Sequence, residues 1–282
     1  MTNASHILDV ANLRVSFPGT AGMVQAVRGV SFRMGRERIG IVGESGSGKS
    51  VTGRSLLRLL PPKARVEAER LHLGGHDLQM LSDRDMRQLR GRHIGLILQD
   101  PKFSLNPVKR VGDLIAEVWR THRGGSRSEA RQAVMDLLQQ VQIRDPKRVI
   151  DAYAHELSGG MGQRVMIALM LAPGPELLIA DEPTSALDAS VQAEVLRVLD
   201  NLVTTRGMGL ILISHDLPLV SRFCDRVLVM YAGRIVEEIA ARDLSKATHP
   251  YTRGLLNCLP RMREKRIPLP ILQRDGSWAN AP

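Results

Sequence analysis

The segment GESGSGKS at residues 43–50 combines three glycines with a lysine and a final serine. It matches the pattern G-x-x-x-x-G-K-[ST] at every fixed position, and it stands between an apolar run and a predicted helix. Glycines let backbone N–H groups face phosphate oxygens, and a helix start adds positive potential. We expect Lys49 to reach the terminal phosphates and the Ser50 hydroxyl to coordinate Mg²⁺. This segment, called the phosphate loop below, predicts nucleotide binding.

A second group of reactive side chains follows the apolar run LLIADEP at 177–183. Four apolar residues place Asp181 at the end of a predicted strand, where a carboxylate can hold Mg²⁺ beside phosphates. Glu182 can orient or deprotonate an attacking water molecule. An isolated Asp-Glu pair is also typical of an acidic turn before a helix. Because a phosphate loop is present, the catalytic interpretation is favoured.

Gln99 and His215 end two further apolar runs, HIGLILQ at 93–99 and LILISH at 210–215. The Gln99 amide can reach Mg²⁺ or the attacking water, and the His215 imidazole can bond the γ-phosphate. Taken alone, either side chain is more often an ordinary loop residue. Their places at strand ends favour a role in the site, because ligands of open α/β sheets bind at the carboxyl ends of the strands.

The elements that must position these residues can be predicted from the hydrophobic pattern. Nearly continuous apolar runs at 38–43, 93–99, 177–182 and 210–215 are typical of strands buried on both faces of a parallel sheet. Alternating segments at 7–17 and 24–34 predict a hairpin, and 226–239 predicts a second one that turns at Ala232–Gly233. The pattern indicates helices at the following ranges: 49–60, 111–120, 128–142, 156–172 and 190–204.

Composition limits the choice of partners. The 282 residues carry a net charge of +10 but only 3% aromatic residues, which is poor for stacking on bases, so we expect no nucleic-acid partner. An anionic membrane surface could attract such a chain. No signal peptide and no apolar run long enough to span a bilayer are predicted. Cys224 and Cys258 have no metal-ligand spacing, which indicates a reducing compartment and no structural metal.

The stretch ELSGGMGQRVMIALMLA at 156–172 predicts a helix that Ser158 caps and that begins with bare backbone at Gly159 and Gly160. A helix start of this kind is an anion site. It falls in a helical insert and not in the predicted sheet. Two interpretations stay open from the residues alone. The stretch is an ordinary capped helix, or it closes over a nucleotide held by a second chain.

These motifs together resemble those of an ABC-transporter ATPase subunit. LSGGM at 157–161, called the signature loop below, is similar to that family's signature, and SALD at 185–188 to its dimer-contact loop. The motifs follow the family's order, and the resemblance covers about residues 7–260. It implies an α/β P-loop NTPase core with a parallel sheet, an N-terminal antiparallel β subdomain and a helical subdomain inserted at about 100–172. It also implies one ATPase domain over 1–259, and the composition indicates a basic, proline-containing tail over 260–282.

The resemblance implies ATP hydrolysis in a dimer that sandwiches ATP, with ATP and Mg²⁺ as cofactors. The catalytic residues would be Glu182, His215 and Gln99, and the metal ligands Ser50, Gln99 and Asp181. Phe17 stands where an aromatic residue usually stacks on adenine, although a core position in the first hairpin is equally expected. The full set of implied nucleotide contacts is Phe17, Gly43, Glu44, Ser45, Gly46, Ser47, Gly48, Lys49, Ser50 and Val51, with Ser158, Gly159, Gly160 and Asp188 acting across the dimer.

Two further strings, QDPKFSLNPV at 99–108 and HPYTRGLL at 249–256, resemble the oligopeptide, dipeptide and nickel importer branch. That branch implies import of a peptide, nickel or a metal chelate. It also implies a second ATPase chain, two permeases and, indirectly, an extracytoplasmic binding protein, with this chain peripheral on the cytoplasmic face of a bacterial inner membrane. Gly162 replaces the usual arginine, so the ATP site that this loop completes is expected to be less active. Cys258 stands alone, so no iron–sulfur cluster is expected.

Two other classes of protein compete with this interpretation. A soluble ABC ATPase of DNA repair or translation usually carries a coiled-coil insert or two tandem cassettes, and this chain has neither. In a P-loop kinase or GTPase, LSGGM and SALD would have no role. The substrate, the choice between a homodimer and a heterodimer, and the number of hydrolysing sites do not follow from the sequence.

Overall fold

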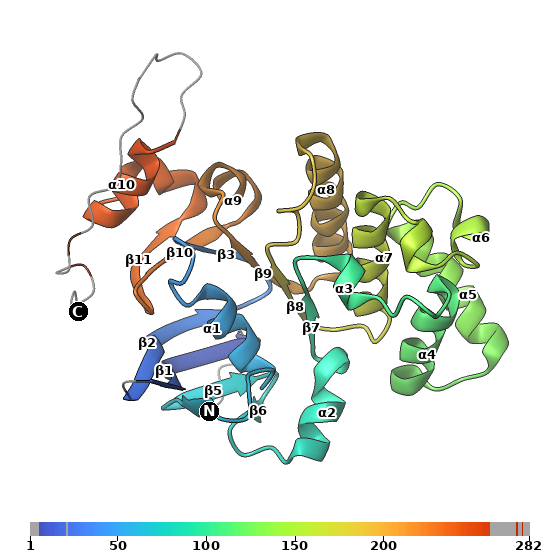
Figure 1. Cartoon of the computed structure of the whole chain (residues 1–282), viewed down its shortest axis with the longest axis horizontal. Coiled ribbons are helices and arrows are strands. Elements are labelled where there is room, and N and C mark those ends of the chain that lie inside the picture. Colours follow the sequence, from blue (N-terminus) through green and yellow to red (C-terminus); the bar gives the residue numbers. More distant parts are fainter. Residues whose placement is uncertain (1–5, 21, 260–274, 276–277, 279–282) are drawn as a thin grey trace. The chain divides into compact units, whose positions relative to one another are not determined.

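The computed structural model describes residues 6–20, 22–259, 275 and 278, without the side chains of residues 102 and 103 (Figure 1). The described chain divides into two compact units. The phosphate-loop unit comprises residues 8–72 and the chain from Leu212 onward, and the helical unit comprises residues 73–211 with the residues before Leu8. The predicted boundaries at 1–259 and 260–282 stay predictions, since nearly all of that tail lies outside the described residues.

The phosphate-loop unit begins with the predicted hairpin. Strand β1 (Leu8–Gly19) pairs antiparallel with β2 (Gly22–Met34), and Gly19 lies opposite Gly22 at the turn. Strand β4 (Arg65–Glu67) also pairs antiparallel with β1, and β5 (Arg70–Leu73) lies next to β1 in the sheet. The predicted antiparallel subdomain is therefore present, although the sequence pattern did not reveal its two short strands.

The other sheet elements of this unit support the phosphate loop. Strand β10 (Arg226–Tyr231) lies between β3 (Arg38–Val42), to which it is parallel, and β11 (Arg234–Ala240), to which it is antiparallel. Ala232 and Gly233 turn this hairpin with φ of 46° and 84°, as in a type I′ turn. The helices here are α1 (Lys49–Leu56), α9 (Leu217–Phe223), the 3₁₀ segment η2 (Ala241–Lys246) and α10 (Pro250–Asn257).

Pro61 and Pro62 follow the predicted range 49–60 and indicate a stop there, but α1 ends earlier, at Leu56. Arg58 takes a left-handed φ of 49°, and the N–H groups of Leu57 and Leu59 both bond the Arg54 carbonyl. This pattern closes the helix at Leu56 and satisfies its last carbonyls. Local capping, and not proline, therefore sets the end of α1.

The helical unit contains two neighbouring parallel strands and most of the helices (Figure 1). Strand β7 pairs with β8 so that Ile97 lies opposite Ala180. Strand β9 begins in this unit and ends in the phosphate-loop unit. The elements, in chain order, are β6 (His76–Asp77), α2 (Asp83–Arg92), β7 (Ile94–Ile97), α3 (Pro101–Ser104), α4 (Val111–Arg123), α5 (Arg127–Gln140), α6 (Pro146–Val149), η1 (Ala154–Glu156), α7 (Gly159–Leu171), β8 (Leu177–Asp181), α8 (Ala189–Arg206) and β9 (Gly209–Ser214).

The predicted insert at about 100–172 corresponds to the elements from α3 to α7. Helix α7 packs against α3, α4, α5 and α8, and it is buried nearly all round. The recurrence of Val165, Ala168, Leu169 and Ala172 at helical spacing predicts only one apolar face. Neighbouring helices on several sides explain the difference, because a central helix must be apolar on each face that it buries. Within the described residues, no helix is both long and apolar enough to cross a bilayer.

A close approach of β3 and α9 gives the first prediction. A Cβ atom on Gly40 would lie 2.1 Å from Val220 Cγ1 and 3.2 Å from Cys224 Sγ. We expect Gly40→Ala to lower the free energy of unfolding by about 1–3 kcal/mol, since overpacking displaces α9. Urea denaturation measures this loss. Adding Val220→Ala makes room and should restore part of the stability, and equal losses with and without it would contradict the steric cause.

Candidate functional site

The phosphate loop is held in place by backbone contacts within its own unit. A Cβ atom on Gly43 would lie 2.1 Å from the Met230 carbonyl oxygen, and one on Gly48 would lie 2.5 Å from the Ala26 carbonyl oxygen. Both glycines have positive φ, 153° and 101°. The Gly233 N–H also donates to the Ser47 carbonyl at 3.0 Å. Only glycine fits at positions 43 and 48, because the loop lies directly against β2 and β10.

The chemistry of the loop fits a phosphate group. The ammonium of Lys49, which is 5% exposed, donates to the carbonyl oxygens of Gly43 and Glu44 at 2.8 Å each. The hydroxyl of Ser47 is buried without a hydrogen-bond partner among the described residues. Helix α1 begins at Gly48 without a side-chain cap and without an acidic residue in its first turn. A buried cation, a buried unpaired hydroxyl and an uncapped helix start all suit an anion.

Gln99, Asp181 and Glu182 come together in the helical unit. Asp181 is the last residue of β8 and is 4% exposed, while Gln99 follows the parallel neighbour β7 by two residues and is exposed. Because Ile97 pairs with Ala180, these side chains leave the same edge of the sheet. Glu182 has a left-handed φ of 49°. A left-handed glutamate is strained, and such strain gathers at functional sites.

The signature loop lies against the start of α8 in the same unit. Ser158 caps α7 by accepting from the Met161 N–H at 3.4 Å. A Cβ atom on Gly160 would lie 2.3 Å from Val191 Cγ1, and one on Gly159 would lie 3.3 Å from Leu187 Cδ2. The absence of these side chains therefore lets the signature loop lie against the loop that contains Asp188. Both loops were predicted to contact the partner chain, and here they are neighbours within one chain.

Asp188 caps α8 through its side chain. One carboxylate oxygen accepts from the Ser190 hydroxyl at 2.6 Å and from the N–H groups of Ser190 and Val191 at 3.1 and 3.0 Å. The hydroxyl bond from Ser190, with the Val191 N–H, lowers the pKa of this carboxyl below its usual value. Asp188 is therefore ionised at neutral pH, and its side chain is exposed.

The remaining predicted residues lie in the phosphate-loop unit. His215 directly follows β9 and is exposed, as a strand-end ligand should be. Phe17 pairs with Val24 in the first hairpin and is half-buried, so it is not a fully buried core residue. Both cysteines are free, and burial raises the pKa of Cys224 to about 12.

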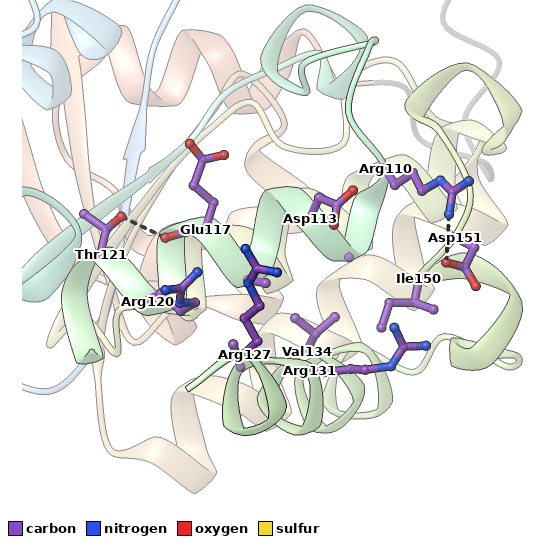
Figure 2. Close-up of a pocket in the computed structure, with 13 residues that line it drawn as sticks. Arg110, Asp113, Glu117, Arg120, Thr121, Arg127, Arg131, Val134, Ile150 and Asp151 are labelled. Atoms are coloured by element: carbon purple, nitrogen blue, oxygen red, sulfur yellow. Dashed lines mark hydrogen bonds and ion pairs between the residues drawn. The ribbon is translucent and has the colours of Figure 1, made fainter. Parts of the chain in front are cut away.

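A cleft in the helical unit was not predicted from the sequence. It has a volume of about 760 Å³ and lies between α4 and α5 (Figure 2). Buried Val134 and Ile150 form an apolar part, and charged side chains surround it. Four arginines meet here, two from α4 and its start and two from α5, and only the packing of α4 on α5 reveals the cleft. The charged lining residues are Arg110, Asp113, Glu117, Arg120, Arg127, Arg131 and Asp151.

The charges of this cleft, called the arginine cleft below, do not balance. Arg110 pairs with Asp151 at 3.4 Å, and Glu117 with Lys109 at 2.5 Å. Within the described part of the chain, the guanidinium groups of the other three arginines form no hydrogen bond or ion pair. These three, Arg120, Arg127 and Arg131, face a single remaining carboxylate at Asp113. The cleft is therefore electropositive.

Comparison with known proteins identifies the class of the chain. The family model described as ABC transporter matches residues 27–185. The dimeric MJ0796 ATP-binding cassette bound to ADP and Pi superposes with a TM-score of 0.73 at 25% identity, covering 83% of this chain and 99% of that one. The cbiO1 protein of Clostridium perfringens superposes with a TM-score of 0.73 at 26% identity, covering 86% of this chain and 91% of that one. The chain belongs to the ABC transporter family.

Two curated relatives narrow this class. A probable peptide ABC transporter ATP-binding protein of Sinorhizobium fredii is 48% identical over 94% of this chain and 81% of its own length. The dipeptide transport ATP-binding protein DppD of Escherichia coli is 45% identical over 92% of this chain and 80% of its own length. The chain is an ATP-hydrolysing subunit of an ABC importer, and it works with a partner ATPase subunit and membrane permeases. A soluble ABC ATPase of DNA repair or translation is not favoured.

The signature loop gives a matched pair of predictions. Gly160→Ala places a Cβ atom 2.3 Å from Val191, so we expect lower stability and at least tenfold slower ATP hydrolysis as the loop shifts. Gly162→Ala meets Pro101 only at 3.4 Å, which is ordinary contact, and should stabilise α7 by about 0.5–1 kcal/mol. Urea denaturation and phosphate release measure both. Equal effects of the two substitutions would contradict this assignment.

Proposed function

We propose that the chain is one of two ATPase subunits of a bacterial peptide importer, bound to two permeases at the cytoplasmic face of the inner membrane. The observation that supports a peptide substrate is the 45–48% identity over most of the chain to proteins named for peptide and dipeptide transport. Those names favour a peptide over the nickel ion or metal chelate that the sequence also suggested. An extracytoplasmic binding protein would deliver the peptide.

The phosphate loop is proposed to bind ATP through residues Gly43 to Val51, whose backbone N–H groups other than that of Glu44 would face the phosphates, with Lys49 against the terminal phosphates. Lys49 supports this role because its ammonium is already buried and held by loop carbonyls, in place to meet an anion. Ser50, Gln99 and Asp181 would hold Mg²⁺, which supplies positive charge against the phosphates when bound. These oxygen donors are the type that Mg²⁺ prefers.

Glu182 is proposed as the residue that orients the attacking water and accepts its proton, with His215 bonding the γ-phosphate. The left-handed φ of Glu182 supports this role, because the strain aims a carboxylate that an unstrained residue would point elsewhere. Phe17 would stack on adenine, and its half-buried ring leaves a face available.

The signature loop and Asp188 are proposed to act on the partner chain. Ser158, Gly159 and Gly160 would close over ATP bound to the partner, while Asp188 would make contact across the dimer. Their proximity supports this, since Gly159 and Gly160 lie against Leu187 and Val191 on either side of Asp188. The partner would be a homologous ATPase chain, and the missing arginine at Gly162 would leave one site less active.

The arginine cleft is proposed to receive a cytoplasmic segment of a permease that carries acidic side chains. Its apolar part suits the apolar side of such a segment, and the three unpaired guanidiniums suit carboxylates. Arg–carboxylate pairs add orientation as well as attraction, so the cleft would fix how the permease sits on the helical unit.

Charge reversal in the cleft tests this partner. Arg127→Glu with Arg131→Glu should reduce recovery of the permeases by more than tenfold in affinity capture, because two attractive charges become repulsive. Basal ATP hydrolysis of the isolated chain should stay within twofold. The matched control is Arg84→Glu with Arg87→Glu on α2, two exposed arginines outside the cleft. Equal loss in both double variants would contradict a specific site.

Affinity capture of the whole chain tests the proposed function. The tagged chain is expressed in its host, membranes are solubilised in detergent, and the captured proteins are identified by mass spectrometry. Glu182→Gln with ATP should raise recovery of a second ATPase chain, because binding without hydrolysis holds the closed dimer. Two permeases should be identified among the captured proteins. A peptide-binding protein of the same transport system should be identified with them. Capture without any permease, from either form, would overturn the importer proposal.

A further inference from the structure

Helix α10 contacts the phosphate loop through one side chain. Tyr251, the second residue of α10, is 0% exposed, and its hydroxyl oxygen accepts a hydrogen bond from the Glu44 backbone N–H at 3.0 Å. The two residues are 207 positions apart in the sequence but belong to the same compact unit. Tyr251 belongs to the string HPYTRGLL, to which the proposed function gives no role.

The bond from Glu44 involves the same peptide group that helps to hold Lys49. The peptide between Gly43 and Glu44 directs its N–H to Tyr251, and its carbonyl oxygen accepts from the Lys49 ammonium at 2.8 Å. Because a peptide group is planar, a rotation that moves one of these atoms moves the other. Tyr251 and Lys49 therefore fix this peptide from its two sides.

The ring of Tyr251 is itself fixed by aromatic neighbours. Its centroid lies 4.6 Å from that of Tyr231, the last residue of β10, and 5.8 Å from that of Trp278. Such tilted pairs stabilise by about 0.5–1.5 kcal/mol each beyond the area that they bury. The hydroxyl is thus held at a defined place by β10, the strand that also carries the Met230 carbonyl against Gly43.

The start of α10 is anchored on β11 by a carboxylate. One oxygen of Glu237 accepts from the Thr248 N–H at 2.7 Å, the Thr248 hydroxyl at 3.1 Å and the His249 N–H at 3.2 Å. Burial alone would raise the pKa of Glu237, but these bonds and Thr252 hold that pKa below its usual value. The helix therefore meets the phosphate loop from a rigid base at neutral pH.

We propose that Tyr251 is a positioning residue for nucleotide binding, whose hydroxyl orients the Gly43–Glu44 peptide and through it the Lys49 ammonium. Helix α10 then contributes to the geometry of the phosphate site, in addition to packing on its own unit. The inference rests on the proposed function only in that the phosphate loop binds ATP. It requires neither a peptide substrate nor a permease.

The test compares Tyr251→Phe with Tyr231→Phe in the full chain. Both changes delete one hydroxyl from the same aromatic cluster, but among the described residues the Tyr231 hydroxyl makes no hydrogen bond. Tyr251→Phe should raise the Kd for Mg-ATP and the KM about three- to tenfold, as expected for one lost hydrogen bond, while kcat changes less than twofold. Tyr231→Phe should leave all three unchanged. Equal affinities for wild type and Tyr251→Phe would overturn the inference.

A double-mutant cycle separates positioning from general destabilisation. Lys49→Met removes the ammonium that the peptide carbonyl holds. If Tyr251 acts through this ammonium, Tyr251→Phe should change the ATP Kd less than twofold in the Lys49→Met background. A full additional loss there would show a merely structural role. Wild-type protein that fails to bind ATP would instead contradict the proposed function, so the two failures are distinguishable.

Discussion

The buried ammonium of Lys49 is the interaction on which the rest of the molecule depends. A cation that is 5% exposed is costly unless oxygen atoms surround it, and here its own loop supplies two carbonyls at 2.8 Å. Those carbonyls must be turned inward, so the loop must follow a path that few side chains allow. The positive φ angles of Gly43 and Gly48, and the contacts of the loop with β2 and β10, are consequences of that single requirement.

In the helical unit, as in the phosphate loop, a glycine without a side chain allows a close approach of the backbone to a neighbouring element. Gly160 brings the signature loop against α8, as Gly43 brings the phosphate loop against β10. In both places glycine removes bulk so that N–H groups stand at a helix start. The molecule therefore has two glycine-rich helix starts of the same kind, and in the proposed function each would face one side of an ATP sandwich.

The sequence was a good guide where local pattern and chemistry agree. The phosphate loop, the strand ends at Asp181 and His215, and the turn at Ala232–Gly233 all follow from residues adjacent in the chain. The end of α1 did not, because the left-handed Arg58 carries no local signal that competes with the prolines beyond it. The arginine cleft and the bond of Tyr251 to Glu44 could not be predicted either. The cleft depends on how the consecutive helices α4 and α5 pack, and the bond joins residues 207 positions apart.

The chain order of the phosphate-loop unit has a consequence for how the protein is made. Strand β3 emerges early from the ribosome, yet its parallel neighbour β10 and the Asp225 carboxylate that accepts from the Arg38 N–H are encoded 187 positions later. Residues 73–211, which form nearly all of the helical unit, are synthesised in between. Such distant pairing is slow to form, and the phosphate loop lacks its contacts with β10 until that strand has been synthesised. A nascent chain without β10 would thus lack the contacts that hold the phosphate loop, which makes nucleotide binding depend on synthesis of this late strand.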